Sequence, residues 1–70
     1  MTIETLNVAT TTEIMRAAGI SMTADTLRAG LKQGVFPFGD CIEREKGPVY
    51  HIYKKLFDQW MHARAVEADD

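Results

Sequence analysis

Two basic side chains on one short predicted helix are the residues best placed to contact a charged partner. Arg28 and Lys32 are four residues apart, and this spacing puts both on the same helix face. Arg can donate two parallel hydrogen bonds to guanine, and Lys can make a salt-sensitive contact with phosphate. The pair is therefore a candidate contact with nucleic acid. The competing interpretation is a solvated helix face that binds nothing.

The helix that carries this pair, over residues 23–33, has recognisable signals at both ends. Thr23 is suited to cap the first turn, because its hydroxyl can accept from a free backbone N–H. Asp25 lies in that turn, where the positive end of the helix dipole favours a carboxylate. Gly34 is suited to end the helix, and Pro37 prevents it from resuming.

A first helix is expected just before this one, over residues 11–18. Thr11 or Thr12 can cap it, and Gly19 ends it. The expected apolar edges are Ile14, Ala17 and Ala18 on the first helix, and Leu27 and Leu31 on the second. Two short helices joined by Gly and a few residues are typical of a helix-turn-helix pair.

A β-hairpin is expected after the second helix, with strands over 41–45 and 48–53 and a two-residue turn at Lys46 and Gly47. That register pairs Cys41 with Ile52, Glu43 with Tyr50, and Arg44 with Val49. Cys41, Tyr50 and Ile52 then share the inner face, and Arg44, Val49 and His51 share the outer one. Glu43 also falls on the inner face, so we expect it at the solvent edge or beside a bulge.

The remaining elements complete one small domain. A closing helix is expected from near Lys54 to Val66, with a wide apolar face formed by Leu56, Phe57, Trp60 and Met61. Residues 1–10 are expected to form an N-terminal arm or short strand that packs through Leu6 and Val8. We therefore expect the chain to consist of an N-terminal arm over 1–10, a domain over 11–66 and an acidic tail over 67–70. The expected fold class is α+β.

Composition excludes several classes of protein. The chain has 70 residues, 46% of them hydrophobic, which is ordinary for one folded domain with a small core. One cysteine forms no internal disulfide, and no apolar run approaches the about 20 residues of a membrane span. We therefore expect a soluble, cytoplasmic protein. The net charge is −2. All eight basic residues nevertheless lie between Arg16 and Arg64, so this central segment carries a slight excess of positive charge.

Catalytic and metal sites are not indicated. Cys41, His51 and His62 lack the paired spacing of metal ligands, and Cys41 is expected to be a small buried residue. A catalytic site needs a nucleophile, a base and a pocket together, and the chain offers no such set. We therefore expect a protein that is not an enzyme and that uses no cofactor.

The order of helix, tight turn, helix, hairpin and helix resembles the excisionase and MerR-like winged helix-turn-helix proteins. These are small DNA-binding proteins of phages and mobile elements. The segments that carry the resemblance are 12–20, 26–28, 32–37, 49–53 and 56–61. The resemblance implies a small winged helix-turn-helix fold and sequence-specific DNA binding. It implies either an excisionase-like recombination directionality factor or a transcriptional regulator, and a neighbouring integrase gene would favour the first.

In this family the second helix enters the major groove and the hairpin touches flanking DNA. Carried over to helix 23–33 and hairpin 41–53, the implied DNA-binding residues are Thr23, Ala24, Arg28, Lys32, Arg44, Lys46 and His51. The implied partner is double-stranded DNA. Further expectations are a homodimer or cooperative multimer, and an integrase or another phage or host protein as partner.

Acidic residues mark a departure from the family pattern. Ala24 and Asp25 stand where the family often has a basic or amide residue, and Glu43 and Glu45 accompany the basic residues of the hairpin. A carboxylate repels phosphate, although it can accept a hydrogen bond from cytosine. The alternative hypothesis is therefore a winged-helix protein-interaction module, such as a phage-encoded inhibitor or adaptor, that does not bind DNA.

Overall fold

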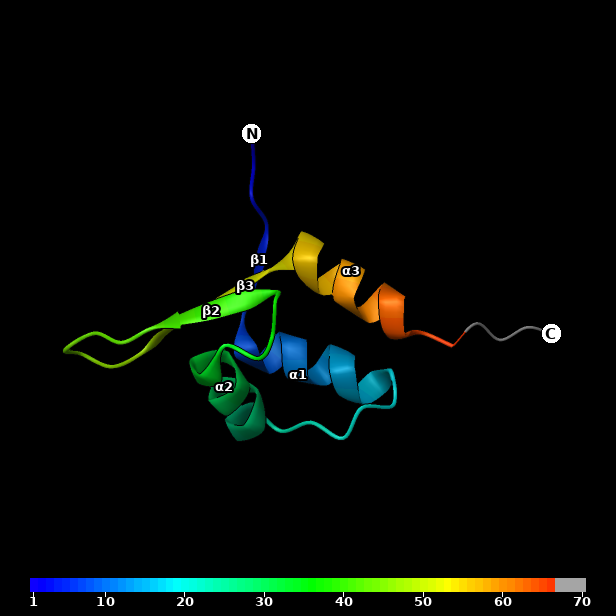
Figure 1. Cartoon of the computed structure of the whole chain (residues 1–70), viewed down its shortest axis with the longest axis horizontal. Helices are drawn as coiled ribbons and strands as arrows, with labels where there is room; N and C mark the ends of the chain where they lie inside the picture. The colour runs from blue at the N-terminus through cyan, green and yellow to red at the C-terminus, as the bar shows by residue number, and fades with distance from the viewer. Residues whose placement is uncertain (67–70) are drawn as a thin grey trace.

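Three helices and a three-stranded antiparallel sheet form a small α+β fold in the computed structural model, which describes residues 1–66 (Figure 1). The acidic tail expected over 67–70 lies outside these residues. The elements are β1 (Thr5–Leu6), α1 (Val8–Ala17), α2 (Ala24–Gln33), β2 (Gly39–Ile42), β3 (Val49–Tyr53) and α3 (Lys54–Arg64). The strand order is β1-β3-β2. The predicted α+β class is confirmed.

Helix α1 begins earlier than predicted. Asn7 is its cap, and Oδ1 of Asn7 accepts from the backbone N–H of Thr10 at 2.7 Å. Thr11 and Thr12 are not caps. They lie inside the helix, where their hydroxyls donate to the carbonyl oxygens of Asn7 and Val8, both at 2.8 Å. Residues 8–10 therefore belong to α1, and the N-terminal arm is shorter than expected.

The buried face of α1 also differs from the prediction. Thr11, Thr12 and Met15 are buried, whereas the expected stripe of Ile14, Ala17 and Ala18 is exposed. The threonines tolerate burial because each hydroxyl is satisfied by a carbonyl one turn earlier. The expected stripe was therefore wrong, because apolar character alone does not show which side of a helix meets the core.

Helix α2 has the predicted ends and the predicted core face. Oγ1 of Thr23 accepts from the backbone N–H of Thr26 at 3.1 Å, and Gly34 ends the helix with φ of 73°. This left-handed conformation suits Gly because it has no Cβ to clash with the backbone. Leu27 and Leu31 are buried, so the opposite flank of α2 is left for solvent or a partner.

Replacement of Thr23 tests this cap. We expect Thr23→Ala to lower the free energy of unfolding by about 0.5–2 kcal/mol, because a first-turn N–H loses its acceptor. Thr23→Ser keeps the hydroxyl and is the matched control. Urea denaturation followed by circular dichroism measures both variants, and equal stability of the Ala and Ser variants would contradict the cap.

The β2–β3 hairpin has a different register from the predicted one. The observed pairs are Gly39 with Ile52, Asp40 with His51, Cys41 with Tyr50, and Ile42 with Val49. The strands are joined by residues 43–48 rather than by a two-residue turn, and the N–H of Gly47 donates to the carbonyl of Arg44 at 2.9 Å. Glu43 is exposed in this loop, so its carboxylate does not lie on the inner face of the hairpin, where the predicted register placed it.

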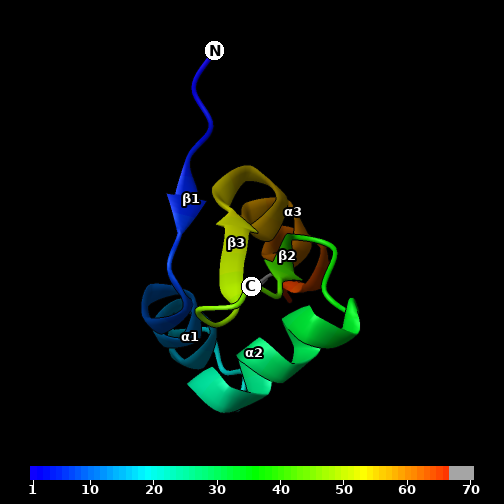
Figure 2. The same ribbon diagram turned by 90° about the vertical axis from the view of Figure 1, so that its left-hand side faces the viewer.

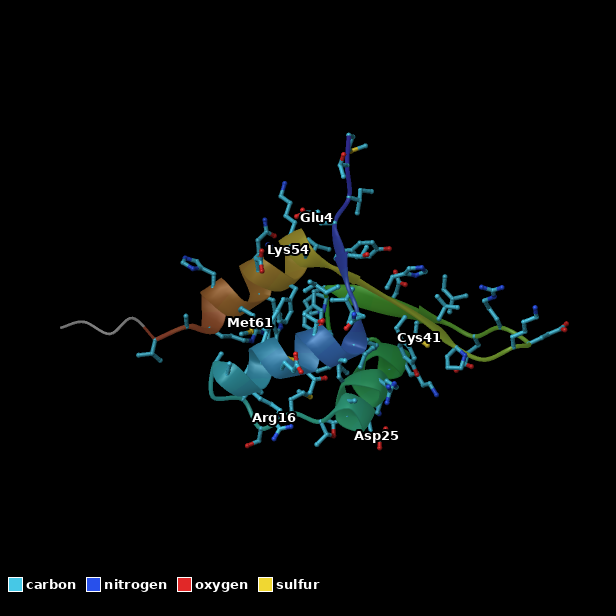
Figure 3. All side chains as sticks on the ribbon, turned by 180° about the vertical axis from the view of Figure 1, so that it is seen from behind. Glu4, Arg16, Asp25, Cys41, Lys54 and Met61 are labelled. Carbon is cyan, nitrogen blue, oxygen red and sulfur yellow. The ribbon has the colours of Figure 1, made fainter. Side chains whose placement is uncertain are left out.

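The residues that remain in the strands keep their predicted faces, because a register shift of two residues leaves a side chain on its original face. Arg44, expected on the outer face, lies instead in the loop that joins the strands. Ile52 is fully buried, and the partly buried Cys41 and Tyr50 pack against the same core. Cys41 is therefore less buried than expected. Figure 3 shows it on the side of the hairpin that faces α2.

Four aromatic rings pack together, two of them buried in the core and two partly buried against it. Phe38 is fully buried, and its ring centroid lies 5.0 Å from Phe36, 5.1 Å from Phe57 and 5.2 Å from Trp60. These contacts connect the segment after α2 with α3, which begins at Lys54 as predicted. Leu56, expected on the apolar face of α3, is 43% exposed. Within residues 1–66, no helix has the length and apolar character needed to cross a membrane.

Candidate nucleic-acid interface

Helix α2 and the β2–β3 hairpin lie next to each other on one side of the molecule. Helix α2 crosses below the base of the hairpin, and the hairpin loop extends beyond it (Figures 1 and 2). Their contact is close, because Cδ2 of Leu31 would lie 3.1 Å from a Cβ placed on Gly39. This contact therefore fixes the position of the hairpin loop relative to the uncovered flank, which is the side of α2 that faces away from the core.

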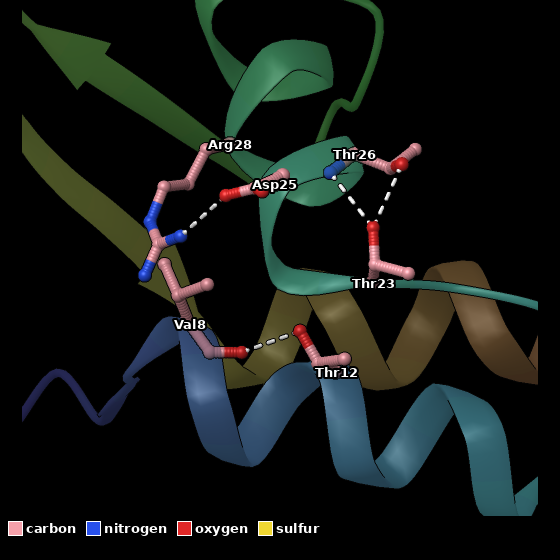
Figure 4. Close-up of polar contacts among 6 residues, drawn as sticks. All are labelled: Val8, Thr12, Thr23, Asp25, Thr26 and Arg28. Carbon is pink, nitrogen blue, oxygen red and sulfur yellow. Dashed lines mark hydrogen bonds and ion pairs between the residues drawn. The ribbon is translucent and has the colours of Figure 1, made fainter.

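Thr23 and Ala24 set where α2 begins. The Thr23 hydroxyl accepts from the backbone N–H of Thr26 and donates to Oγ1 of Thr26 at 2.9 Å (Figure 4). Ala24 is partly buried and has no polar side-chain atom. Of the four residues predicted on this helix, these two set its start. The hydroxyl hydrogen of Thr23 is already donated to Thr26, and Ala24 has no polar side chain.

Arg28 and Lys32 are the cations of the uncovered flank. Both are exposed, one in the middle and one in the last turn of α2. Nη1 of Arg28 donates to Oδ1 of Asp25 at 3.1 Å, so the Arg28 charge is partly balanced before any ligand arrives. This pair was not predicted, although the three-residue spacing of opposite charges is its signal in the sequence.

The hairpin loop presents the other two predicted cations. Arg44 and Lys46 are exposed, and each follows an exposed glutamate, Glu43 or Glu45. The hydrogen bond from Gly47 to the Arg44 carbonyl shapes the loop, and Gly47 has φ of 123°, which other residues rarely adopt. The loop therefore brings two cations to the tip of the hairpin with no net charge of its own.

His51 lies on the other face of the sheet. It alternates with Tyr50 and Ile52, which face the core where α2 packs, so His51 points away from α2. Its Nδ1 lies 3.0 Å from Oδ1 of Asp40, and the Tyr53 hydroxyl donates to Oδ2 of Asp40 at 3.4 Å. The structure therefore separates His51 from the other six predicted residues and gives it a carboxylate partner, Asp40, that was not predicted.

Two further cations are engaged within the fold. Nζ of Lys54 donates to Oδ2 of Asp58 at 2.7 Å, and this hydrogen bond raises the pKa of Lys54 above its ordinary value. The guanidinium of Arg64 lies 4.2 Å from the centroid of the Trp60 ring. Figure 3 shows Lys54 and Asp25 on opposite sides of the molecule, so the start of α3 is remote from the flank of α2.

Other chemistry has little support in the described part of the chain. No group of three or more His, Cys, Asp or Glu side chains gathers there as a metal site. Two open hollows lie away from the hairpin loop. One is between the N-terminal segment and the start of α3, and the other is between Ala18 and the end of α3.

Comparison with known proteins gives no match. No protein-family model, no curated protein and no solved structure matches this chain.

Proposed function

We propose that this chain is a winged helix-turn-helix protein that binds double-stranded DNA. In this proposal α1 and α2 are the helix-turn-helix pair, the β2–β3 hairpin is the wing, and α3 closes the core. The observation that carries the proposal is the position of α2. It is buried through Leu27 and Leu31, while Arg28 and Lys32 are exposed beside a projecting hairpin.

The width of an α-helix and the basic side chains of this region are compatible with binding in the major groove. The major groove is about 12 Å wide and admits an α-helix. An Arg side chain on a helix in the major groove can pair with a guanine edge, whereas Lys side chains and hairpin loops contact phosphates. Arg28, in the middle of α2, is therefore assigned to a base, and Lys32, Arg44 and Lys46 to the DNA backbone. Because His51 lies on the opposite sheet face, it is not part of the proposed contact.

The biological role that we propose is that of an excisionase-like recombination directionality factor or a transcriptional regulator of a phage or mobile element. Both roles need the same DNA contact, and the sequence resemblance supports them equally. The core is small, with six buried hydrophobic residues among residues 1–66, and this favours binding as a dimer or a cooperative multimer.

DNA binding can be measured by fluorescence anisotropy with labelled duplexes of mixed sequence at several salt concentrations. We expect affinity to fall steeply with salt, because each phosphate contact releases counterions. Lys32→Ala should reduce the slope of log K against log salt by about 0.9, the value for one phosphate. Arg28→Ala should weaken binding to a preferred site by about 1–3 kcal/mol.

Lys55→Ala is the matched control, because it removes the same charge from the first turn of α3, far from α2. It should leave the salt slope unchanged. Equal effects of Lys32→Ala and Lys55→Ala would mean that only net charge matters. Absence of salt-dependent binding to any duplex would overturn the proposal. It would favour the protein-interaction module, for which the balanced charges of the loop and Asp25 are the supporting observation.

A further inference from the structure

The ion pair at the start of α2 places a hydrogen-bond acceptor beside a donor on the uncovered flank. Nη1 of Arg28 donates to Oδ1 of Asp25 at 3.1 Å (Figure 4). The Asp25 side chain is 97% exposed, and the Arg28 side chain is 44% exposed. Both groups therefore remain accessible to a ligand that approaches this flank.

The fold has little need of the Asp25–Arg28 pair. Water screens an ion pair between exposed side chains, so its contribution to stability is small. Asp25 does favour the start of the helix through the helix dipole, but that effect needs no partner at Arg28. The pairing with Arg28 thus has no strong structural reason.

Each member of the pair keeps unused hydrogen-bonding groups. Oδ2 of Asp25 accepts no hydrogen bond from residues 1–66, and Arg28 uses only Nη1 in the contact with Asp25. In the major groove, the Arg fork matches O6 and N7 of guanine, and a carboxylate accepts from the N4 amino group of cytosine. A carboxylate is repelled by base edges that present only acceptors. Asp25 is therefore suited to select one base.

We infer that Asp25 is a specificity-determining residue, which selects a cytosine directly beside a guanine bound by Arg28. The inference rests on the proposed function and names the DNA sequence feature that this site would recognise. The two side chains are in contact, and stacked base pairs are about 3.4 Å apart, so they reach neighbouring base pairs. The Asp25 carboxylate contacts the Arg28 guanidinium, so the two side chains present their remaining hydrogen-bonding groups side by side.

Selection from a library of random duplexes, with the full chain as bait, tests the inference. The unchanged protein should enrich sites in which guanine and cytosine contacts are adjacent. Asp25→Asn should replace the preferred cytosine with adenine at that single position, because Asn pairs with N6 and N7 of adenine. Discrimination at that position should change by about 5- to 150-fold. Asp25→Ala should remove the preference there while the helical circular dichroism stays unchanged.

Asp58→Asn is the matched control, because it makes the same substitution in another exposed ion pair, on α3. Its selected sites should equal those of the unchanged protein. If the unchanged protein binds DNA and Asp25→Asn selects the same sites, the inference is overturned and the proposed function stands. If the unchanged protein binds no duplex, both are overturned.

Discussion

Phe38→Ala is expected to lower the free energy of unfolding by about 3–5 kcal/mol, the range for a large aromatic side chain lost from a core. Phe38 is fully buried and lies within 5.2 Å, between ring centroids, of Phe36, Phe57 and Trp60. Truncation leaves a cavity where α2, the sheet and α3 meet. Because a domain of this size has only a few kcal/mol of stability, the variant should be largely unfolded at 37 °C.

Urea denaturation followed by Trp60 fluorescence measures this effect, since Trp60 contacts Phe38 directly. Phe38→Leu keeps most of the volume and gives a measurable intermediate if the Ala variant does not fold. Val35→Ala is the control, because Val35 is 61% exposed and should change stability by less than about 0.5 kcal/mol. Equal effects of Val35→Ala and Phe38→Ala would contradict the position of Phe38 in the core.

Gly39→Ala has the second largest expected effect. A Cβ at this position would clash with the backbone oxygen of His51 and would lie 3.2 Å from Cα of Ile52 and 3.1 Å from Cδ2 of Leu31. Backbone cannot move aside as a flexible side chain can, so the two strands must separate or α2 must shift. We expect a loss of about 1–3 kcal/mol, the range for overpacking in a core.

Thermal denaturation of Gly39→Ala tests this close approach. A loss of 1 kcal/mol should lower the melting temperature by about 4–8 °C in a domain of this size. Gly34→Asn is the control, because Gly34 has φ of 73°, which Asn tolerates, and no atom lies within 4 Å of an added Cβ. If Gly39→Ala melts at the same temperature as the unchanged protein, Gly39 cannot be the point where the hairpin meets α2.

Helix α2 was predictable because its ends depend on local chemistry. The Thr23 cap, Asp25 in the first turn and Gly34 at the end act within a few residues of the chain, and the structure confirms all three. The burial of Leu27 and Leu31 followed from their spacing. For α3 the start at Lys54 was predicted correctly, while the exposure of Leu56 shows that its apolar face is narrower than its sequence indicates.

Helix α1 was less predictable because several residues compete for the same role. Asn7, Thr11 and Thr12 can all cap a helix, and the structure selects Asn7. The alternatives are decided by packing, since Thr11 and Thr12 lie on the side that meets the core. The hairpin register places Gly39 opposite Ile52, at the point where Leu31 of α2 approaches closely.

By itself, the sequence determined the apolar and basic edges of α2, the alternation of side chains in the hairpin strands, and the α+β class. These features depend on residue spacing and on nearby residues. Strand alternation had already placed His51 on the outer face of the hairpin. Only the tertiary structure decided that α2 packs against the inner face and that the strand register pairs His51 with Asp40. The candidate DNA contact is therefore smaller than the seven predicted residues. It gains Asp25 through local spacing, because Asp25 and Arg28 lie one helical turn apart. The side of the molecule on which this turn lies follows from packing between distant segments.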